Sequence, residues 1–241
     1  LIVVVSSCQT GDTKKETTQA KKEKVVAKKY KMTTQIPENV LMPDQVETRL
    51  GTLEFFDGVP TAETAQKIWD HQDFSRAVES MIMCTPAASL SGFRRGIREF
   101  GPDNETAIIW ESRLDSKGLL LTGNTSVIYL FMWIDTKNGP VVMETPPNIL
   151  AIVDDFWFHY VTDIGNAGPD RGKGGKYIIL PPDYEGDLEE SAFVKRSNTY
   201  GNWFCIRGFP KGDDNAAVVK NIKDNLKVYP LAEKANPKPV Q

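Results

Sequence analysis

The chain has 241 residues, enough for one large domain or two small ones with a substantial core. Its apolar fraction of 40% and charged fraction of 25% are those of an ordinary globular protein. The net charge of −3 argues against a nucleic-acid partner, because nucleic-acid-binding domains present a strongly basic surface.

The cysteines are few, and their spacing is unlike that of a zinc site. Cys84 and Cys205 both lie in apolar surroundings, which favours buried free thiols. A disulfide between them stays open as an alternative, since it would require Cα atoms within about 7 Å of each other.

The chain begins with an apolar run, residues 1–5, followed by two serines and Cys8. This pattern is typical of the end of a signal peptide, and small residues directly before a cysteine resemble a bacterial lipobox. We therefore predict lipidation of Cys8 and attachment to a membrane, with several acyl chains making the attachment stable. The run is far shorter than the roughly 20 residues that span a bilayer. By resemblance to bacterial lipoproteins, Gln9 directly after the cysteine favours attachment to the outer membrane. The protein would then face the periplasm or the exterior.

Residues 9–45 are predicted to form a flexible tether rich in lysine and threonine. Between Lys14 and Lys31 there are eight lysines against two acids, with no sustained apolar period. Contact with an anionic lipid surface is an alternative, but a solvated spacer is the interpretation that we prefer.

A folded region follows the tether. Residues 48–60 predict a short strand and a turn, after which Thr61 can cap a helix. Apolar residues continue at helical spacing over 65–82, Pro86 interrupts the pattern, and a second short helix is expected to end at Gly101. We expect these helices to pack by their apolar faces.

Short strands separated by turn residues take over beyond Asn104. They are predicted at 106–111, 118–122, 126–135, 141–145, 149–153, 156–162, 176–180, 192–196 and 202–207. Residues 127–134 are apolar on both alternating faces, which predicts a central strand covered on both sides. Asn138 and Gly139 indicate a hairpin turn. The regular spacing favours an antiparallel sandwich, so the predicted class is mainly β with flanking helices (α+β).

After the strands, a helix is predicted to open at Asp213 and to place four apolar residues on one face (Ala216, Val219, Ile222 and Leu226). The predicted organisation is a truncated signal peptide with a lipobox (1–8), the tether (9–45), a sandwich domain with N-terminal helices (46–210), and a helix and linker towards a further C-terminal domain (211–241).

Many ordered motifs of the chain resemble those of the bacterial family called domain of unknown function 1254. They are Thr48–Gly51, Phe56–Pro60, Leu121–Thr125, Gly139–Pro140, Asp154–Phe158, Asp163–Tyr177, Leu180–Pro182, Arg196–Tyr200 and Tyr229–Leu231. The resemblance implies an immunoglobulin-like β-sandwich. It also implies a second, jelly-roll module, domain of unknown function 1214, as a C-terminal partner. The family has no established catalytic residues, so none is carried over.

The stretch 154–184 combines charge, aromatic residues and glycine most densely. Candidate catalytic residues within it are His159, Asp155, Asp163 and Asp170, since a histidine titrates near neutrality and carboxylates can orient it. If 156–162 is a strand, Asp155 and His159 share one face about 13–14 Å apart, too far to act on one another. The alternative is a hydrogen-bonded histidine half-buried among aromatic side chains.

The glycine-dense turn at 165–175 does not fit a phosphate-binding loop, because it lacks the required spacing and leads into a strand. Its glycines are expected to permit positive φ, with Asp163 or Asp170 bonding the turn's backbone amides. Arg171, Lys173 and Lys176 are candidate ligand-binding residues for an anion. A calcium loop from Asp163, Asn166 and Asp170 is an alternative, but the carboxylate spacing of a known calcium loop is missing, so we expect no metal. We also expect no cofactor.

Two functions remain open at this point. The first is a lipid-anchored envelope protein whose sandwich binds a ligand or partner, or docks the second domain. The second is a hydrolase-like or acid/base enzyme whose site lies around His159 and the aspartates. No G-x-S-x-G motif or cysteine–histidine pairing indicates nucleophilic catalysis. A homo-oligomer is also left open.

Overall fold

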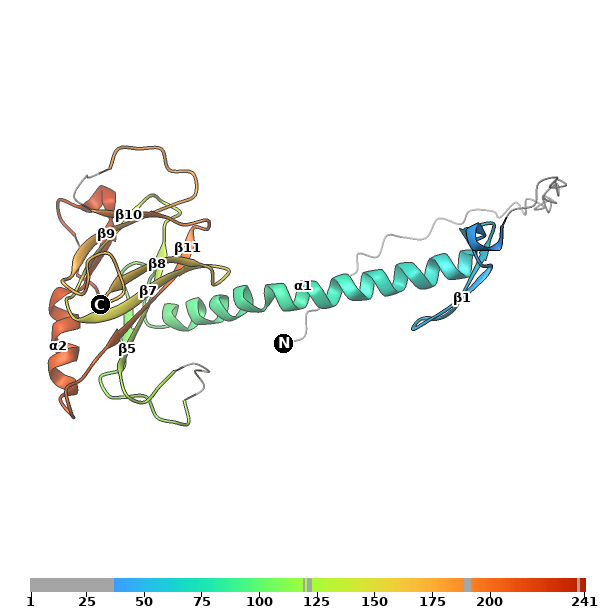
Figure 1. The fold of residues 1–241 in the computed structure, drawn as a ribbon. Helices are drawn as coiled ribbons and strands as arrows, with labels where there is room; N and C mark the ends of the chain where they lie inside the picture. Colours follow the sequence, from blue (N-terminus) through green and yellow to red (C-terminus); the bar gives the residue numbers. More distant parts are fainter. Residues whose placement is uncertain (1–36, 119, 121–122, 189–191, 238) are drawn as a thin grey trace, which may run out of the picture. The chain divides into compact units, whose positions relative to one another are not determined.

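The computed structural model describes residues 37–118, 120, 123–188, 192–237 and 239–241 (Figure 1). Cys8 and most of the predicted tether lie outside the described residues. The chain divides into two compact units, residues 1–67 and 68–241, which we describe separately. Within the described part of the chain, no helix combines the length and the apolar character needed to cross a membrane.

The described part of the first unit contains a small antiparallel sheet of order β1-β2-β3. After a 3-10 turn, Glu38–Val40 (η1), its strands are Gln45–Thr48 (β1), Gly51–Phe56 (β2) and Val59–Pro60 (β3). Asp57 and Gly58 both take positive φ in the turn between β2 and β3. The backbone N–H of Thr64 donates to Thr61 Oγ1 at 3.2 Å. The predicted turn and the Thr61 cap are therefore confirmed.

One helix, Ala62–Arg98 (α1), replaces the two short helices predicted from the sequence. Pro86 lies inside this helix. A proline in a helix interior removes one backbone N–H and costs about 3 kcal/mol, and packing elsewhere along the helix can offset that cost. That packing is concentrated after the proline, where Leu90 is only 1% exposed and Ile97 only 2%.

The half of α1 before Pro86 is exposed, so the expected packing of its apolar face is wrong there. Phe74 is 67% exposed and Met81 is 77% exposed, and Trp69, Val78 and Ile82 also face solvent. Cys84 is an exposed free thiol rather than a buried one, whereas Cys205 is free and buried as predicted.

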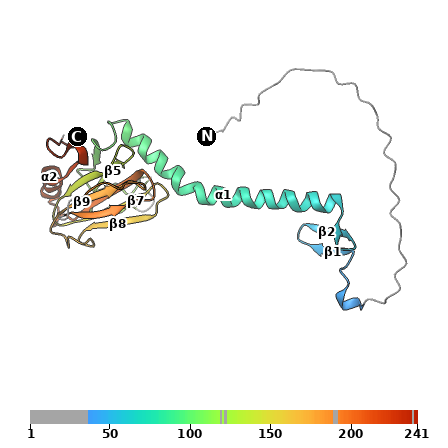
Figure 2. The same cartoon turned by 90° about the horizontal axis from the view of Figure 1, so that it is seen from above.

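Two sheets in the second unit form the predicted sandwich (Figure 2). One has the order β4-β5-β11-β7-β8, with strands Ala107–Ile109 (β4), Ile128–Asp135 (β5), Gly201–Gly208 (β11), Ile149–Asp155 (β7) and Tyr160–Gly165 (β8). The other has the order β10-β9-β6-β12, with strands Phe193–Arg196 (β10), Gly175–Leu180 (β9), Val141–Thr145 (β6) and Lys227–Pro230 (β12). The pairings are antiparallel except that of β10 with β9. The prediction of an antiparallel, immunoglobulin-like sandwich in an α+β chain is confirmed at the level of two packed, mostly antiparallel sheets.

The main core lies between the two sheets, and β5 is buried on both of its faces as predicted. Ile128, Leu130, Met132 and Ile134 contribute to the core together with Val141, Met143, Tyr177 and Ile179 from the second sheet. The opposite face of β5 packs against the C-terminal part of α1 through Tyr129, Phe131 and Trp133. This arrangement fixes the end of α1 over the β5 side of the five-stranded sheet.

Residues 211–230 belong to the sandwich rather than to a linker beyond it. A second helix, Asn215–Asn225 (α2), begins after the N-cap Asp214, one residue later than predicted. Its buried Val219 and Ile222 enter the main core, and α2 lies beside the strands in both views (Figures 1 and 2). β12, which the sequence did not predict, pairs with β6. The predicted boundary after residue 210 therefore cuts through a packed unit. A short 3-10 turn, Leu231–Glu233 (η2), follows β12.

Other local predictions differ from the structure. The turn at Asn138 and Gly139 forms, but it joins β5 to β6 in different sheets and is not a hairpin. The strand predicted at 118–122 falls largely on residues outside the described set, and Gly118 and Leu120 are not in a strand. The strand predicted at 156–162 begins only at Tyr160, because residues 156–159 form a turn.

Candidate functional site

Asp155 and His159 are brought together by a tight hairpin between β7 and β8. The backbone N–H of Asp155 donates to the His159 carbonyl at 2.8 Å. Asp155 Oδ2 lies 3.4 Å from His159 Nδ1. The predicted separation of about 13–14 Å is therefore wrong, because it assumed an extended strand through the turn.

The contact does not make an open acid/base site. Asp155 is buried, and its Oδ1 accepts hydrogen bonds from the backbone N–H groups of Trp157 and His159 at 2.8 and 2.9 Å. The side chain of His159 is 72% exposed, so it is not half-buried among aromatic residues. Asp155 thus serves the geometry of the hairpin, with His159 on its outer side.

Asp170 organises the glycine-dense turn. Its Oδ1 accepts from the Gly165 N–H at 2.7 Å and from the Tyr177 hydroxyl at 2.5 Å, and its Oδ2 accepts from the Gly174 N–H at 3.1 Å. Burial, followed by this hydrogen bond, raises the pKa of Tyr177. Gly165 and Gly174 have positive φ. The predicted backbone role is therefore confirmed for Asp170, whose carboxylate is fully engaged and buried.

The three predicted basic residues do not form one anion site. Arg171 is exposed on the turn, with a positive φ. Lys173 and Lys176 line a shallow depression of about 500 Å³ that also holds Glu144, Asp224 and Lys227. Glu144 accepts from the Lys227 ammonium at 3.0 Å and from the Tyr229 hydroxyl at 2.7 Å. The depression is mixed in charge, which weakens the case for anion recognition.

Asp163 lines a different feature, a groove of about 300 Å³ on the outer face of the five-stranded sheet. We call this the Asp154 groove, and its lining residues are Leu150, Ala151, Ile152, Asp154, Phe158, Asp163, Trp203, Cys205 and Arg207. Asp163 is half-buried and lies opposite Ile152 in the β7–β8 pairing. Of the four predicted catalytic residues, Asp163 alone lines this groove.

The strand register explains why these side chains meet. Side chains alternate along a strand, so Leu150, Ile152 and Asp154 of β7 point to the outer face at intervals of about 7 Å. They pair with Arg207, Cys205 and Trp203 of β11, respectively. Because α1 packs over β5, the β7 and β8 side of this face stays open.

Aromatic side chains bound one end of the groove. The rings of Phe158 and Trp203 stack with centroids 5.4 Å apart and an interplanar angle of 27°. The ring centroids of Phe93, from α1, and Trp203 lie 5.9 Å apart, which links the groove to the helix. The Trp203 indole N–H is buried and has no hydrogen-bond partner within the described chain. The hairpin at 156–159 therefore contributes Phe158, rather than His159, to this site.

Asp154 is the unusual group of the groove. The residue is 5% exposed, and its carboxylate has no hydrogen bond or ion pair with the described residues. Burial raises the pKa of Asp154 to about 6, with further contributions from the negative charges of Asp155 and Asp163. Such a carboxyl can change its protonation state near neutral pH.

Cys205 lies at the centre of the groove but is not a nucleophile. Burial raises the pKa of its thiol to about 12, and the neighbouring Arg207 opposes this only in part. Because the thiolate is the reactive form, the Cys205 thiol stays inert at neutral pH.

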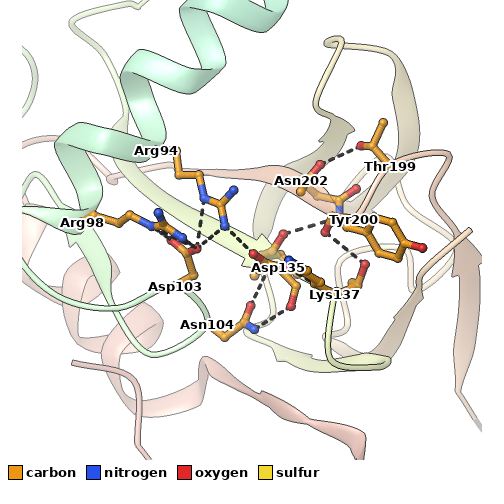
Figure 3. Close-up of polar contacts among 12 residues, drawn as sticks. Arg94, Arg98, Asp103, Asn104, Asp135, Lys137, Thr199, Tyr200 and Asn202 are labelled. Atoms are coloured by element: carbon orange, nitrogen blue, oxygen red, sulfur yellow. Dashed lines mark hydrogen bonds and ion pairs between the residues drawn. The ribbon is translucent and has the colours of Figure 1, made fainter.

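A separate ionic network ties α1 to the sandwich (Figure 3). Arg94 donates to Asp103 Oδ2 through both Nε, at 3.0 Å, and Nη2, at 2.6 Å, and it also pairs with Asp135 at the end of β5. Arg98 donates to the same Asp103 carboxylate. The Arg94 guanidinium lies 5.3 Å from the centre of the Trp133 ring. The network holds the covering helix in place, and each of its charges is already paired.

Sequence reasoning missed Asp154 as a site residue. The available signal was an acid that continues an apolar face, after Leu150 and Ile152 in the same strand. That signal became specific only once the register placed Trp203 opposite Asp154.

The two packed sheets, with a helix over part of one outer face, define a β-sandwich protein of the α+β class. The chain belongs to the family described as "Protein of unknown function (DUF1254)", whose model matches residues 105–230.

The fold is similar to the crystal structure of the VPA0106 protein from Vibrio parahaemolyticus, with a TM-score of 0.51 and 21% sequence identity. The similarity covers 67% of this chain and 40% of that one, so this chain matches about two fifths of the length of that protein. At this identity the likeness concerns the fold alone. No curated protein matches the chain.

Proposed function

We propose that the protein is a lipid-anchored protein of the bacterial cell envelope whose sandwich binds a small ligand in the Asp154 groove. The observation that carries the ligand-binding part is the buried carboxylate of Asp154, which has no partner within the described chain and lines an apolar groove. Burying an unpaired charge is costly, so a fold that served stability alone would gain from an apolar residue here.

The groove has the general properties of a small-molecule site. Its volume of about 300 Å³ lies at the lower end of the usual range of ligand pockets, about 300–1,000 Å³. Its walls are mainly aliphatic and aromatic, with a few polar groups at defined positions. This combination is typical of sites in which apolar contact supplies affinity and a polar group fixes orientation.

Binding is tested by a thermal-shift screen of small molecules against the wild-type chain and two matched variants. Leu150→Trp fills the groove and should abolish any shift, whereas Glu79→Trp places the same bulk on exposed α1 and should not. A shift that survives Leu150→Trp would place binding elsewhere and contradict the proposal.

The envelope part of the proposal is supported by the apolar run and the two serines before Cys8. Fatty-acid labelling in a bacterial host should mark the wild-type chain and Cys84→Ser but not Cys8→Ser. Equal labelling of Cys8→Ser would contradict the anchor.

Two further proposals concern partners of the sandwich. A C-terminal jelly-roll module is proposed from the family resemblance, and a homo-oligomer is proposed from the exposed apolar face of α1.

An acid/base enzyme is the second candidate, and one observation favours it. A carboxyl with a pKa of about 6 in a groove is suited to accept and donate protons near neutrality. On this reading Asp154 replaces His159 as the acid/base group, because His159 does not line the groove. Turnover of a bound ligand that is lost in Asp154→Asn and retained in His159→Ala would establish it, whereas retention in Asp154→Asn would exclude it.

A further inference from the structure

On the basis of the ligand binding proposed above, we infer that the ligand is a small organic cation. It carries an ammonium or guanidinium group on an apolar body, and its positive charge pairs with Asp154.

The charges around Asp154 favour a cation. Asp163 faces the groove from β8, and the buried Asp155 lies beside Asp154 in the chain. Both neighbours add negative charge, so a positive group placed between Asp154 and Asp163 would be attracted by two carboxylates and stabilised by the third. An anion at the same position would meet repulsion from all of them.

The one basic side chain that lines the groove does not pair with Asp154. Arg207 lies opposite Leu150, two outward-facing positions along the sheet from Asp154. Its guanidinium lies over the Tyr129 ring, 5.7 Å from the ring centre, and it interacts with the Cys205 thiol. Within the described chain, no ion pair joins Arg207 to Asp154, so the carboxylate stays available to a ligand.

The walls favour an organic cation over a metal ion. A calcium ion takes six to eight oxygen ligands. The described residues contain no group of three or more His, Cys, Asp or Glu that could hold a metal ion. Instead, Ile152, Phe158 and Trp203 offer apolar and aromatic surface next to the carboxylate. Aromatic faces also attract organic cations, which adds to the pairing with Asp154.

Cation binding should depend on pH, since it requires the ionised form of Asp154. The pKa of this carboxyl is about 6 in the free groove, and a bound cation would lower it. Affinity should therefore rise between about pH 5 and pH 7 and then level off. The other titratable or charged groups around Asp154 are Asp163, Asp155 and Arg207, and the Cys205 thiol stays neutral over this range.

The test compares three probes of one shape: phenethylamine (cationic), phenethyl alcohol (neutral) and phenylacetate (anionic). Each is titrated at pH 7.5 into the full chain, and the indole resonance of Trp203 is followed by NMR. We expect phenethylamine to bind at least tenfold more tightly than the other two. Asp154→Asn should reduce this binding at least tenfold, whereas Glu79→Gln, an acid on exposed α1, should leave it unchanged.

The outcomes separate the class of ligand from ligand binding itself. Equal or tighter binding of the alcohol or of phenylacetate would overturn the cation inference and leave the proposed function standing. If none of the probes shifts Trp203 and the thermal-shift screen also finds no groove ligand, the proposed function fails with it. If Asp154→Asn does not fold, Asp163→Asn is the second variant. We expect it to reduce the affinity for phenethylamine about threefold, and an unchanged affinity would overturn the inference.

Discussion

Asp154 lies directly opposite Trp203 in the pairing of β7 with β11, which places a buried carboxylate beside a stacked aromatic pair. Within the described chain, neither the Asp154 carboxylate nor the Trp203 indole N–H has a hydrogen-bond partner. This relationship is the basis of the groove.

Replacing Asp154 by asparagine should stabilise the folded protein at neutral pH. The folded-state pKa of Asp154 is raised to about 6, so the stability associated with its protonated form is present below the unfolded value of about 3.9 and is lost as pH rises through 6. Asp154→Asn removes this loss and should gain about 1–3 kcal/mol at pH 7.5. Urea unfolding of both proteins at pH 4 and at pH 7.5 measures this difference in the free energy of unfolding. A gain of equal size at the two pH values would contradict the raised pKa of Asp154.

Asp103 should make the opposite contribution. Burial would raise its pKa, but hydrogen bonds from Arg98 and Arg94 outweigh burial and lower it. Its stabilisation is therefore complete above the unfolded value of about 3.9 and is lost as pH falls through the lower folded value.

The variant Asp103→Asn should cost about 2 kcal/mol at pH 7 and progressively less below pH 4. Asp73→Asn is the matched control, because its pair with Arg76 is 3.9 Å long and exposed, and should cost under about 0.5 kcal/mol. Equal losses in the two variants, measured by urea unfolding, would show that the network in Figure 3 does not hold α1.

The carboxylate of Asp170 should be essential to the glycine-dense turn. Asp170→Ala leaves the Tyr177 hydroxyl and the Gly165 N–H without partners and should cost about 3 kcal/mol. Tyr177→Phe removes one of these hydrogen bonds and should cost less, about 1 kcal/mol. Thermal unfolding of both variants checks the order, and a Tyr177→Phe loss as large as that of Asp170→Ala would reverse it.

The two halves of α1 should respond differently to truncation. Leu90→Ala removes a side chain that is 1% exposed and should cost about 2–4 kcal/mol. Val78→Ala, on the exposed half, should change stability by less than about 0.5 kcal/mol. A large loss for Val78→Ala at any protein concentration would show that this half is covered, and a loss that appears only at high concentration would indicate self-association.

Thiol labelling should distinguish the two described cysteines. Cys84 is exposed and should react with a maleimide within minutes at pH 7.5. Cys205 is buried, with a pKa raised to about 12, and should react only after denaturation. Mass spectrometry of the folded chain counts the labels at each position, and rapid labelling of Cys205 would argue against the closed strand pairing around it.

Much of the sandwich follows from apolar runs that are visible in the sequence. β6 and β9 were predicted almost to the residue, because short apolar segments bounded by turn residues have few other solutions. The hairpin at 156–159 was missed because Phe158 takes a positive φ of 65° without being glycine or asparagine. Contacts distant in sequence, such as the stacking of Phe158 on Trp203, stabilise this conformation, and the local pattern does not contain them.

The sequence predicted the candidate site less well than the fold. His159 and Asp170 were singled out by residue type, yet one is exposed and the other holds a turn. The property that distinguishes Asp154 is burial without a partner, which depends on β11, some fifty residues further along the chain. Sequence alone therefore located the right stretch but could not choose among its acids.

The most direct test of the account is a ¹³C NMR titration of the Asp154 carboxyl with and without saturating phenethylamine. We predict a pKa of about 6 for the free protein and a clearly lower value with the amine bound, because the cation stabilises the ionised form. A free value near 3.9, or a value that the amine leaves unchanged, would contradict the claim that Asp154 receives a cation in this groove.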